Sequence, residues 1–311
     1  MNSYEQELRE KWNSISYRQG GSLQLGITHP LEWHVSYFSP EAKSVVIVSD
    51  DPVNKIECSK SIQASCKPRK DGRFATSLTL VSREQEDDFV TMCGDMIEFS
   101  GNETDRKQSL MKVLRRYAAW LKLLQNKNSA LLGAAAQKGL IGELLYLKEK
   151  IEKGMDPLDL LAGWVGPDGA DQDFIYYDGW HEIKTTGASS SEITISSVEQ
   201  LDNAESGELI VNRVDKCAPA QAGAFTLYGL VHQIINMINS CPGALDTFIL
   251  KLASNGYIDM KEYDQQTYVF ASRQIYDVND TFPRIRRSDL PTEIVNTTYV
   301  LNIPSLAIWK K

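Results

Sequence analysis

The 311-residue sequence contains no apolar run that approaches the roughly 20 residues of a membrane-spanning helix. It has only five cysteines, which are scattered and form no Cys-x-x-Cys pair, and only four histidines, none of them in a metal-like pair. A disulfide framework and a zinc site are therefore disfavoured. The N-terminus also lacks a signal-peptide pattern. We expect a cytoplasmic protein that does not enter a membrane.

Several other signatures are missing as well. The sequence shows no internal repeat, no low-complexity tract, no coiled-coil heptads and no Walker-type phosphate loop. Use of ATP by this chain is therefore not expected. The composition, 42% hydrophobic and 24% charged, is that of an ordinary globular protein, long enough for one large or two modest domains.

Positive charge is in short supply, because the net charge is −8. A protein that meets DNA needs Lys and Arg for the phosphates, so any DNA surface must be a local patch. Each basic cluster can equally be a solvated surface, but Arg284, Arg286 and Arg287 are compact and favour phosphate contacts. The three clusters are 67–73, 106–116 and 284–287.

The order of hydrophobic patterns predicts an α/β protein in three parts. Residues 1–105 are expected to form a mostly antiparallel β-rich region with one or two helices. Residues 106–240 are expected to hold two long helices, a hairpin and further strands, and residues 241–311 an α+β extension. The first long helix ends at the break Asn126–Ser129, with Ser129 as a candidate N-cap of the second.

The second long helix, expected from about Ala130 to Lys153, contains Gly133, Gly139 and Gly142. Each glycine costs a helix roughly 1 kcal/mol relative to alanine. Such residues are tolerated where another backbone packs closely. We therefore expect this helix to lie directly on a sheet.

The most informative stretch is a predicted hairpin at residues 173–184. Asp178-Gly179 is a strong signal for a two-residue turn, because glycine readily adopts the positive φ that a type I′ turn requires. That turn would place Asp173 opposite Lys184 and diagonal to Glu182. Because side chains alternate along strands, these three share one face of the hairpin. The other face is apolar and carries Phe174, Tyr176 and Ile183.

Two carboxylates and an ammonium on one strand face have two interpretations. Asp173 and Glu182 could together bind one divalent cation, with hard oxygen ligands that suit Mg²⁺ or Mn²⁺. Lys184 would then orient a water or stabilise charge on a phosphate. The alternative is an exposed strand with a weak cross-strand ion pair.

This stretch resembles the PD-(D/E)XK nuclease superfamily, the restriction-endonuclease-like proteins. Asp173 matches the family's first acid, and Glu182-Ile183-Lys184 matches its Glu-x-Lys. Glu143 matches the acid that the preceding helix often carries. The run 192–201 resembles the strand and second core helix that follow, with Gln200 as the polar residue of some branches. The resemblance implies a restriction-endonuclease-like core, a mixed central sheet flanked by helices.

The first acid of the motif has competitors. The literal Pro-Asp pair is Pro167-Asp168, and Asp171 lies one same-face step further from the turn than Asp173. We favour Asp173 because it opens the apolar strand. The resemblance also implies that the backbone carbonyl of Ile183 is a metal ligand, with Glu143 or Asp171 as a further one.

The resemblance implies a function: a Mg²⁺-dependent endonuclease, with Mn²⁺ as a substitute, that hydrolyses DNA phosphodiester bonds. The bacterial branch most similar to the chain is associated with restriction and phage defence. A motor ATPase or a methyltransferase of the same system is then the expected partner, and a homodimer is also compatible. Two alternatives are a non-catalytic scaffold or binding subunit of a defence complex, and a nuclease for RNA or for branched or damaged DNA.

Overall fold

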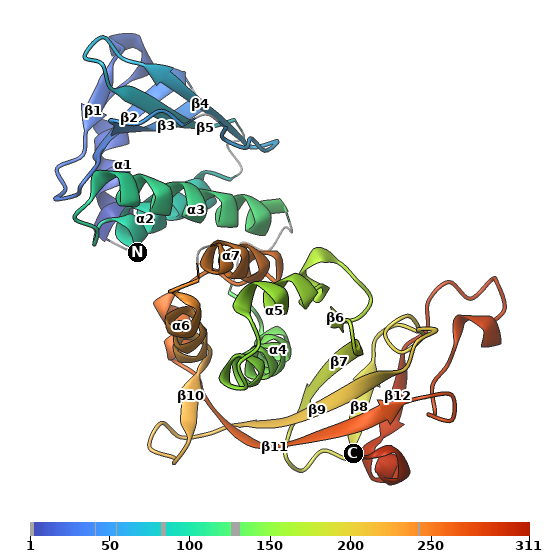
Figure 1. The fold of residues 1–311 in the computed structure, drawn as a ribbon. Coiled ribbons are helices and arrows are strands. Elements are labelled where there is room, and N and C mark those ends of the chain that lie inside the picture. The colour runs from blue at the N-terminus through green and yellow to red at the C-terminus, as the bar shows by residue number, and fades with distance from the viewer. Residues whose placement is uncertain (1–2, 41, 54, 82–84, 126–130, 242) are drawn as a thin grey trace. The chain divides into compact units, whose positions relative to one another are not determined.

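The computed structural model of the chain describes residues 3–40, 42–53, 55–81, 85–125, 131–241 and 243–311. The chain divides into two compact units, residues 1–129 and 130–311, each of which is an α/β assembly (Figure 1). The expected boundary after residue 105 falls inside the first unit, and the one after residue 240 falls inside the second. In the part of the chain that the structure describes, every helix is too short or too polar to cross a membrane.

The first unit is an antiparallel sheet with three helices. Its strands follow the order β1-β2-β3-β5-β4, and every neighbouring pair is antiparallel. The expected β-rich region is therefore present, and β4 is a strand that the sequence pattern did not predict. The bounds are α1 Ser3–Ser14, β1 Ser22–Gln24, β2 Glu32–Ser39, β3 Ala42–Ser49, β4 Ile62–Pro68, β5 Phe74–Leu80, α2 Glu86–Ser100 and α3 Arg106–Gln125.

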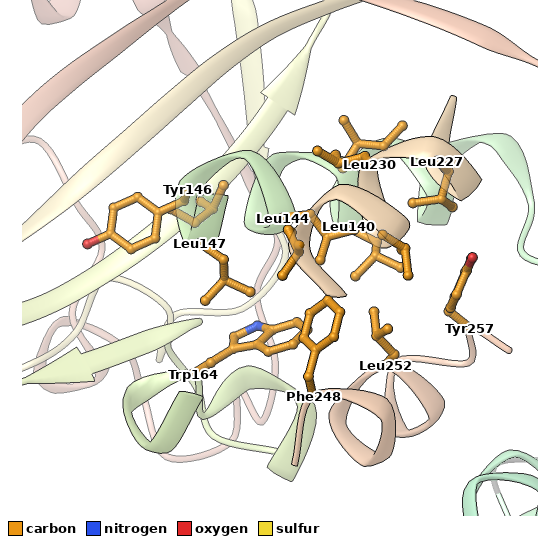
Figure 2. Packing of buried hydrophobic residues seen from close by; sticks show 14 of the residues in the cluster. Leu140, Leu144, Tyr146, Leu147, Trp164, Leu227, Leu230, Phe248, Leu252 and Tyr257 are labelled. Atoms are coloured by element: carbon orange, nitrogen blue, oxygen red, sulfur yellow. The ribbon is translucent and has the colours of Figure 1, made fainter. Parts of the chain in front are cut away.

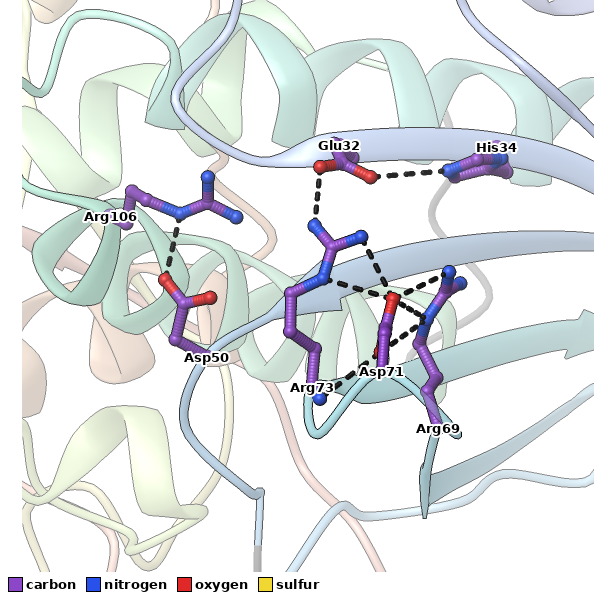
Figure 3. Close-up of polar contacts among 7 residues, drawn as sticks. All are labelled: Glu32, His34, Asp50, Arg69, Asp71, Arg73 and Arg106. Atoms are coloured by element: carbon purple, nitrogen blue, oxygen red, sulfur yellow. Dashed lines mark hydrogen bonds and ion pairs between the residues drawn. The ribbon is translucent and has the colours of Figure 1, made fainter.

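Large aromatic side chains fill the core of this unit, and ion pairs join the loops at one end of its sheet. Trp12, Trp33 and Trp120 are almost fully buried. Figure 3 shows Asp71 accepting hydrogen bonds from both Arg69 and Arg73. Two guanidinium groups of the basic cluster at 67–73 are thus engaged with the chain's own carboxylates.

The second unit is built on a five-stranded mixed sheet. The strand order is β10-β11-β9-β7-β6, in which only β7 and β9 run parallel. A separate antiparallel pair joins β8 and β12. The bounds are α4 Ala134–Glu152, α5 Pro157–Gly163, β6 Phe174–Tyr176, β7 Gly179–Thr186, β8 Glu192–Ile195, β9 Gly207–Lys216, β10 Ala224–Thr226, α6 Leu227–Ile238, α7 Ala244–Ser254, β11 Thr267–Val278 and β12 Tyr299–Asn302.

Both faces of the mixed sheet are covered by apolar side chains. On one face, Ile183 and Ile210 belong to a cluster with residues of α4, α5, α6 and α7, part of which Figure 2 shows. On the other face, Trp180 and Leu209 pack with residues of β8, β12 and the short helix Ile303–Trp309. A mixed sheet flanked by helices is the architecture that the resemblance implied.

Two expectations for this unit need comment. The helix expected after residue 195 does not form, because β8 ends at Ile195 and residues 196–203 make a turn. The break at residues 126–129 and the N-cap at Ser129 lie outside the described residues; α4 begins at Ala134 with Gly133 as its N-cap.

Candidate active site

The hairpin forms, but its register differs from the expected one by two residues. Tyr176 pairs with Gly179 and Phe174 with His181, so the turn residues are Tyr177 and Asp178. One further step in this register places Asp173 opposite Glu182, where the sequence had predicted Lys184. Because a shift of two residues keeps every side chain on its face, Asp173, Glu182 and Lys184 still share one face, and Phe174, Tyr176 and Ile183 still share the other.

Asp173 is held in place from both sides. Its backbone carbonyl accepts hydrogen bonds from the N–H groups of Val165 and Gly166, both at 3.0 Å. Its carboxylate Oδ2 accepts one from the N–H of Ile183 at 2.7 Å. The carboxylate therefore lies against the edge of β7, just beyond the point where β6 begins.

Glu182 and Lys184 are joined by an ion pair on the same face. The Lys184 Nζ lies 2.8 Å from Glu182 Oε1, and Glu182 is only 1% exposed. Lys184 Nζ also donates to Gln200 Oε1 at 2.9 Å. The other oxygen of Glu182, Oε2, is buried and has no hydrogen-bond partner among the residues that the structure describes. A buried carboxylate oxygen without a partner costs free energy, and a cation would offset that cost.

Glu143 reaches the same place from α4. Its Oε2 accepts a hydrogen bond from the indole N–H of Trp164 at 2.7 Å and a longer one from Asn255 Nδ2 at 3.4 Å. Gly142, the preceding residue, lies directly on the sheet, since a Cβ there would meet Thr185 Oγ1 at 2.0 Å. The close packing expected of the helix glycines holds at Gly142, whereas a Cβ added at Gly139 would meet no described atom outside its own helix backbone within 4 Å.

The three carboxylates are electrostatically linked. Burial raises the pKa of Glu182 to about 8, and the nearby Asp173 carboxylate adds to the rise. Burial also raises the pKa of Asp173 to about 6, against the Ile183 hydrogen bond and Lys184, which lower it. The pKa of Glu143 lies well above its ordinary value because of burial first, and then because of Asp173 and Glu182. Raised pKa values at clustered carboxylates are typical of functional sites.

A backbone carbonyl completes the arrangement. In an extended strand the N–H and C=O of one residue point to the same edge. The N–H of Ile183 points to Asp173, so its carbonyl also faces the Asp173 side of β7. This is the position that the resemblance implied for a carbonyl ligand.

Asp168 and Asp171, the competing acids, are placed differently. Asp168 belongs to the short helix Gly166–Asp168, and its Oδ2 accepts a hydrogen bond at 2.6 Å from Lys251 Nζ, which also donates to the Trp164 carbonyl. Asp171 is exposed on the loop. Of the three candidates, Asp173 is the one that contacts β7.

The three arginines predicted to contact phosphate are engaged with the chain. Arg284 donates to the carbonyls of Leu201 and Asn203. Arg286 pairs with Asp280, and Arg287 pairs with Glu199 at 2.6 Å. A phosphate would have to compete with these contacts.

The donor set at the candidate site fits a hard divalent cation. In the residues that the structure describes, no group of three or more His, Cys, Asp and Glu side chains is arranged to hold a metal ion. Two carboxylates, Asp173 and Glu182, with the Ile183 carbonyl form a smaller set. Mg²⁺ suits such a set, because it usually keeps several waters and takes only one or two protein carboxylates.

Sequence reasoning missed three residues that support the site: Trp164 and Asn255, which hydrogen-bond to Glu143, and Gln172, whose amide donates to the Glu199 carbonyl at 2.7 Å. Gln172 is 6% exposed although it lies in a Gly- and Asp-rich loop. An amide directly beside a motif acid was its only signal in the sequence.

Comparison with known proteins gives one match. No curated protein and no solved structure matches the chain significantly. A family model matches residues 8–304, nearly the whole chain, and carries the description "Putative PD-(D/E)XK family member, (DUF4420)". The chain therefore belongs to this family.

Proposed function

We propose that the chain is a Mg²⁺-dependent endonuclease that hydrolyses DNA phosphodiester bonds, with Mn²⁺ as a substitute metal. The observation that carries the proposal is the buried Glu182 Oε2, which lacks a hydrogen-bond partner within the described part of the chain and belongs to a residue on the same face as Asp173. Buried polar atoms in folded proteins generally have a hydrogen-bond partner, and a bound cation would provide one for this oxygen. Membership of a PD-(D/E)XK family supports a nuclease-like function.

Each side chain has a distinct role in the proposal. Asp173, Glu182 and the Ile183 carbonyl hold the metal, which when bound supplies positive charge to the phosphate oxygens. Lys184 orients the attacking water from the position between Glu182 and Gln200 that it occupies in the structure. Glu143, fixed by Trp164, supports the metal site from α4.

The substrate and the cellular setting are further parts of the proposal. We propose DNA as the substrate and assign no sequence specificity, because no residue of the site is assigned to base recognition; RNA or branched or damaged DNA is the substrate to test next. We propose a role in a bacterial restriction or phage-defence system, with a motor ATPase or a methyltransferase as a partner. The five free thiols agree with the reducing environment of the cytoplasm.

Conversion of supercoiled plasmid to nicked and linear DNA tests the function. We expect Mg²⁺-dependent cleavage by the unmodified protein. We expect Asp173→Asn, Glu182→Gln and Lys184→Ala each to lower the rate at least about a hundredfold, the loss seen when a charged group of an active site is removed. Circular dichroism of each variant would verify that the fold is intact.

Asp171→Asn is the matched control, because Asp171 is an exposed acid of the same loop two residues from Asp173. We expect it to retain nearly full activity. Full activity in Lys184→Ala, or loss of activity in Asp171→Asn with Asp173→Asn active, would contradict the assigned roles. The same reactions with single-stranded RNA and branched DNA would identify the preferred substrate.

A non-catalytic binding subunit is the second candidate. The observation that favours it is that Arg284, Arg286 and Arg287 already contact oxygens of the chain itself. The basic cluster that was expected to contact phosphate is therefore engaged, in a chain whose net charge is −8. If titration with Mn²⁺ produces neither binding heat nor a shift in melting temperature, this candidate replaces the nuclease.

A further inference from the structure

The turn that carries Gln200 is fastened to the C-terminal part of the chain. Gln200 Oε1 accepts hydrogen bonds from Lys184 Nζ at 2.9 Å and from the N–H of Ser196 at 2.8 Å. The amide oxygen thus links the lysine of the motif to the backbone of the 196–203 turn. Residues 196–203 belong to no helix or strand, so the position of the turn depends on its side-chain and backbone contacts with other segments.

Gln172 and Thr298 each donate one hydrogen bond to carbonyls of the turn, and two arginines make further contacts with it. The guanidinium of Arg284 donates to the Leu201 carbonyl, one residue after Gln200. Arg287 contacts the turn twice: its backbone N–H donates to Asp202 Oδ2 at 2.7 Å, and its guanidinium donates to Glu199 Oε1 at 2.6 Å. The residues on both sides of Gln200 are therefore held by the same four-residue segment, Arg284–Arg287.

Apolar packing adds to this attachment. Leu201 is fully buried in a cluster with Phe282, which lies two residues before Arg284, and with Leu301 of β12. Arg286, by contrast, turns to Asp280, a carboxylate that is 94% exposed. Adjacent residues of the same type thus differ in whether they contact the turn.

We propose that Arg284 and Arg287 are positioning residues, which hold the 196–203 turn so that Gln200 keeps Lys184 at its place beside Glu182. A lysine ammonium sits on a flexible four-carbon stem and needs fixed acceptors to keep one direction. The kinetic part of this inference rests on the proposed nuclease function; the placement of Lys184 does not.

Acylation of lysines by a short pulse of acetic anhydride, read by peptide mass spectrometry, tests the placement without any activity. We expect Lys184 to react severalfold faster in Gln200→Ala and in the double variant Arg284→Met/Arg287→Met than in the unmodified protein. Arg286→Met should leave its rate unchanged. The exposed Lys310 is the internal reference, and the buried Lys251 reports any general loosening of the fold.

Cleavage kinetics on plasmid DNA separate positioning from phosphate contact. A misplaced group of about 1 Å can cost about a hundredfold in rate, so we expect the double variant to lose at least about tenfold in kcat with KM unchanged. Glu199→Gln should lower kcat in the same direction but by less, because it weakens the Arg287 contact by removing its negative charge and leaves every positive charge in place. Asp280→Asn, its matched control, should not.

The outcomes are distinct. A higher KM and a weaker salt dependence in both Arg287→Met and Arg286→Met would mean that these residues bind phosphate, and would overturn the proposal. Unchanged Lys184 reactivity in the double variant would overturn it as well. Absence of cleavage by the unmodified protein on every nucleic acid would contradict the proposed function, and the acylation result would still decide the role of the arginines.

Discussion

Glu182 has an unusual environment for a carboxylate that is meant to be charged. It is 1% exposed, and its Oε2 has no hydrogen-bond partner in the part of the chain that the structure describes. Burial raises its pKa from the ordinary value of 4.5 to about 8. Folding therefore favours the protonated form at neutral pH, and a bound cation would have to displace that proton.

The raised pKa of Glu182 predicts a pH dependence of stability. A carboxyl group with a higher pKa in the folded state binds its proton more tightly when folded, so its contribution to stability is complete below pH 4.5 and is lost as the pH rises towards 8. We expect the metal-free protein to melt at a lower temperature at pH 8 than at pH 6. Glu182→Gln should reduce this difference, as thermal unfolding followed by circular dichroism would show.

Mn²⁺ should reverse the trend, because it binds the deprotonated carboxylate. Its affinity is expected to rise with pH by up to about tenfold per unit, the value for release of one proton. Isothermal titration calorimetry in buffers of different ionisation enthalpy would detect the released proton. An affinity independent of pH between 6 and 8 would argue against Glu182 as a ligand.

At the scale of single residues, the sequence predicted which side chains share a strand face better than it predicted their hydrogen-bond partners. Alternation along strands was enough to place Asp173, Glu182 and Lys184 on one face, since an error of two residues does not change the face. Partners such as Trp164 and Asn255 could not be predicted, because they come from an α5 cap and an α7 cap far along the chain. Only tertiary packing brings their N–H groups to Glu143.

Among the elements, the hairpin shows why a strong turn signal can still give the wrong register. Gly179 does adopt a positive φ, 136°, but as the first residue of β7 and not as a turn residue. Trp180 is buried, packs closely on Gly207, and donates to the Glu205 carbonyl. Packing of this tryptophan against β9 accompanies the observed register of the hairpin. A prediction from the turn residues alone cannot take that contact into account.

The α4 glycines provide a matched pair of substitutions. A Cβ at Gly142 would meet Thr185 Oγ1 at 2.0 Å, whereas one at Gly139 would meet nothing within 4 Å. We expect Gly142→Ala to lower the free energy of unfolding by about 1–3 kcal/mol through overpacking. Gly139→Ala should raise it by about 0.5–1 kcal/mol, because alanine is the better helix former.

Urea denaturation of both α4 variants measures the difference directly. Equal effects of the two substitutions would mean that α4 does not rest on β7 at Gly142.

The helix expected after residue 195 shows a second limit of local sequence patterns. Its polar and β-branched residues, Ser196-Ser-Val-Glu-Gln200, fit a turn as well as a helix, and contacts from distant parts of the chain, namely from Gln172 and the arginine segment, accompany the turn that forms.

In the molecule as a whole, the candidate site residues all belong to the second unit. Every candidate metal ligand and the three arginines belong to residues 130–311. The two apolar clusters on either face of the mixed sheet are also formed by residues from 132 onward. The family model nevertheless covers both units. The β-rich region could be predicted from its alternating apolar and polar residues, whereas no sequence motif indicates its function.

These clusters predict that residues 131–311 fold without the first unit. A separately expressed fragment should give a single cooperative thermal transition and should keep the near-ultraviolet circular dichroism of its buried tryptophans, Trp164 and Trp180. Residues 3–125, expressed alone, are the companion fragment. A fragment 131–311 without a cooperative transition would show that its core is incomplete.

The shortness of β6 has a consequence for the edge of the sheet. β6 pairs only with Gly179–His181, so beyond His181 the outer edge of β7 is met by the carboxylate of Asp173, which accepts from the N–H of Ile183. An unpaired strand edge invites pairing with another chain. We therefore expect Asp173 to keep this edge from pairing with another chain, in addition to its proposed role at the metal site. Replacement by Asn keeps an oxygen acceptor at this edge, while replacement by Ala would leave the N–H bare and favour aggregation.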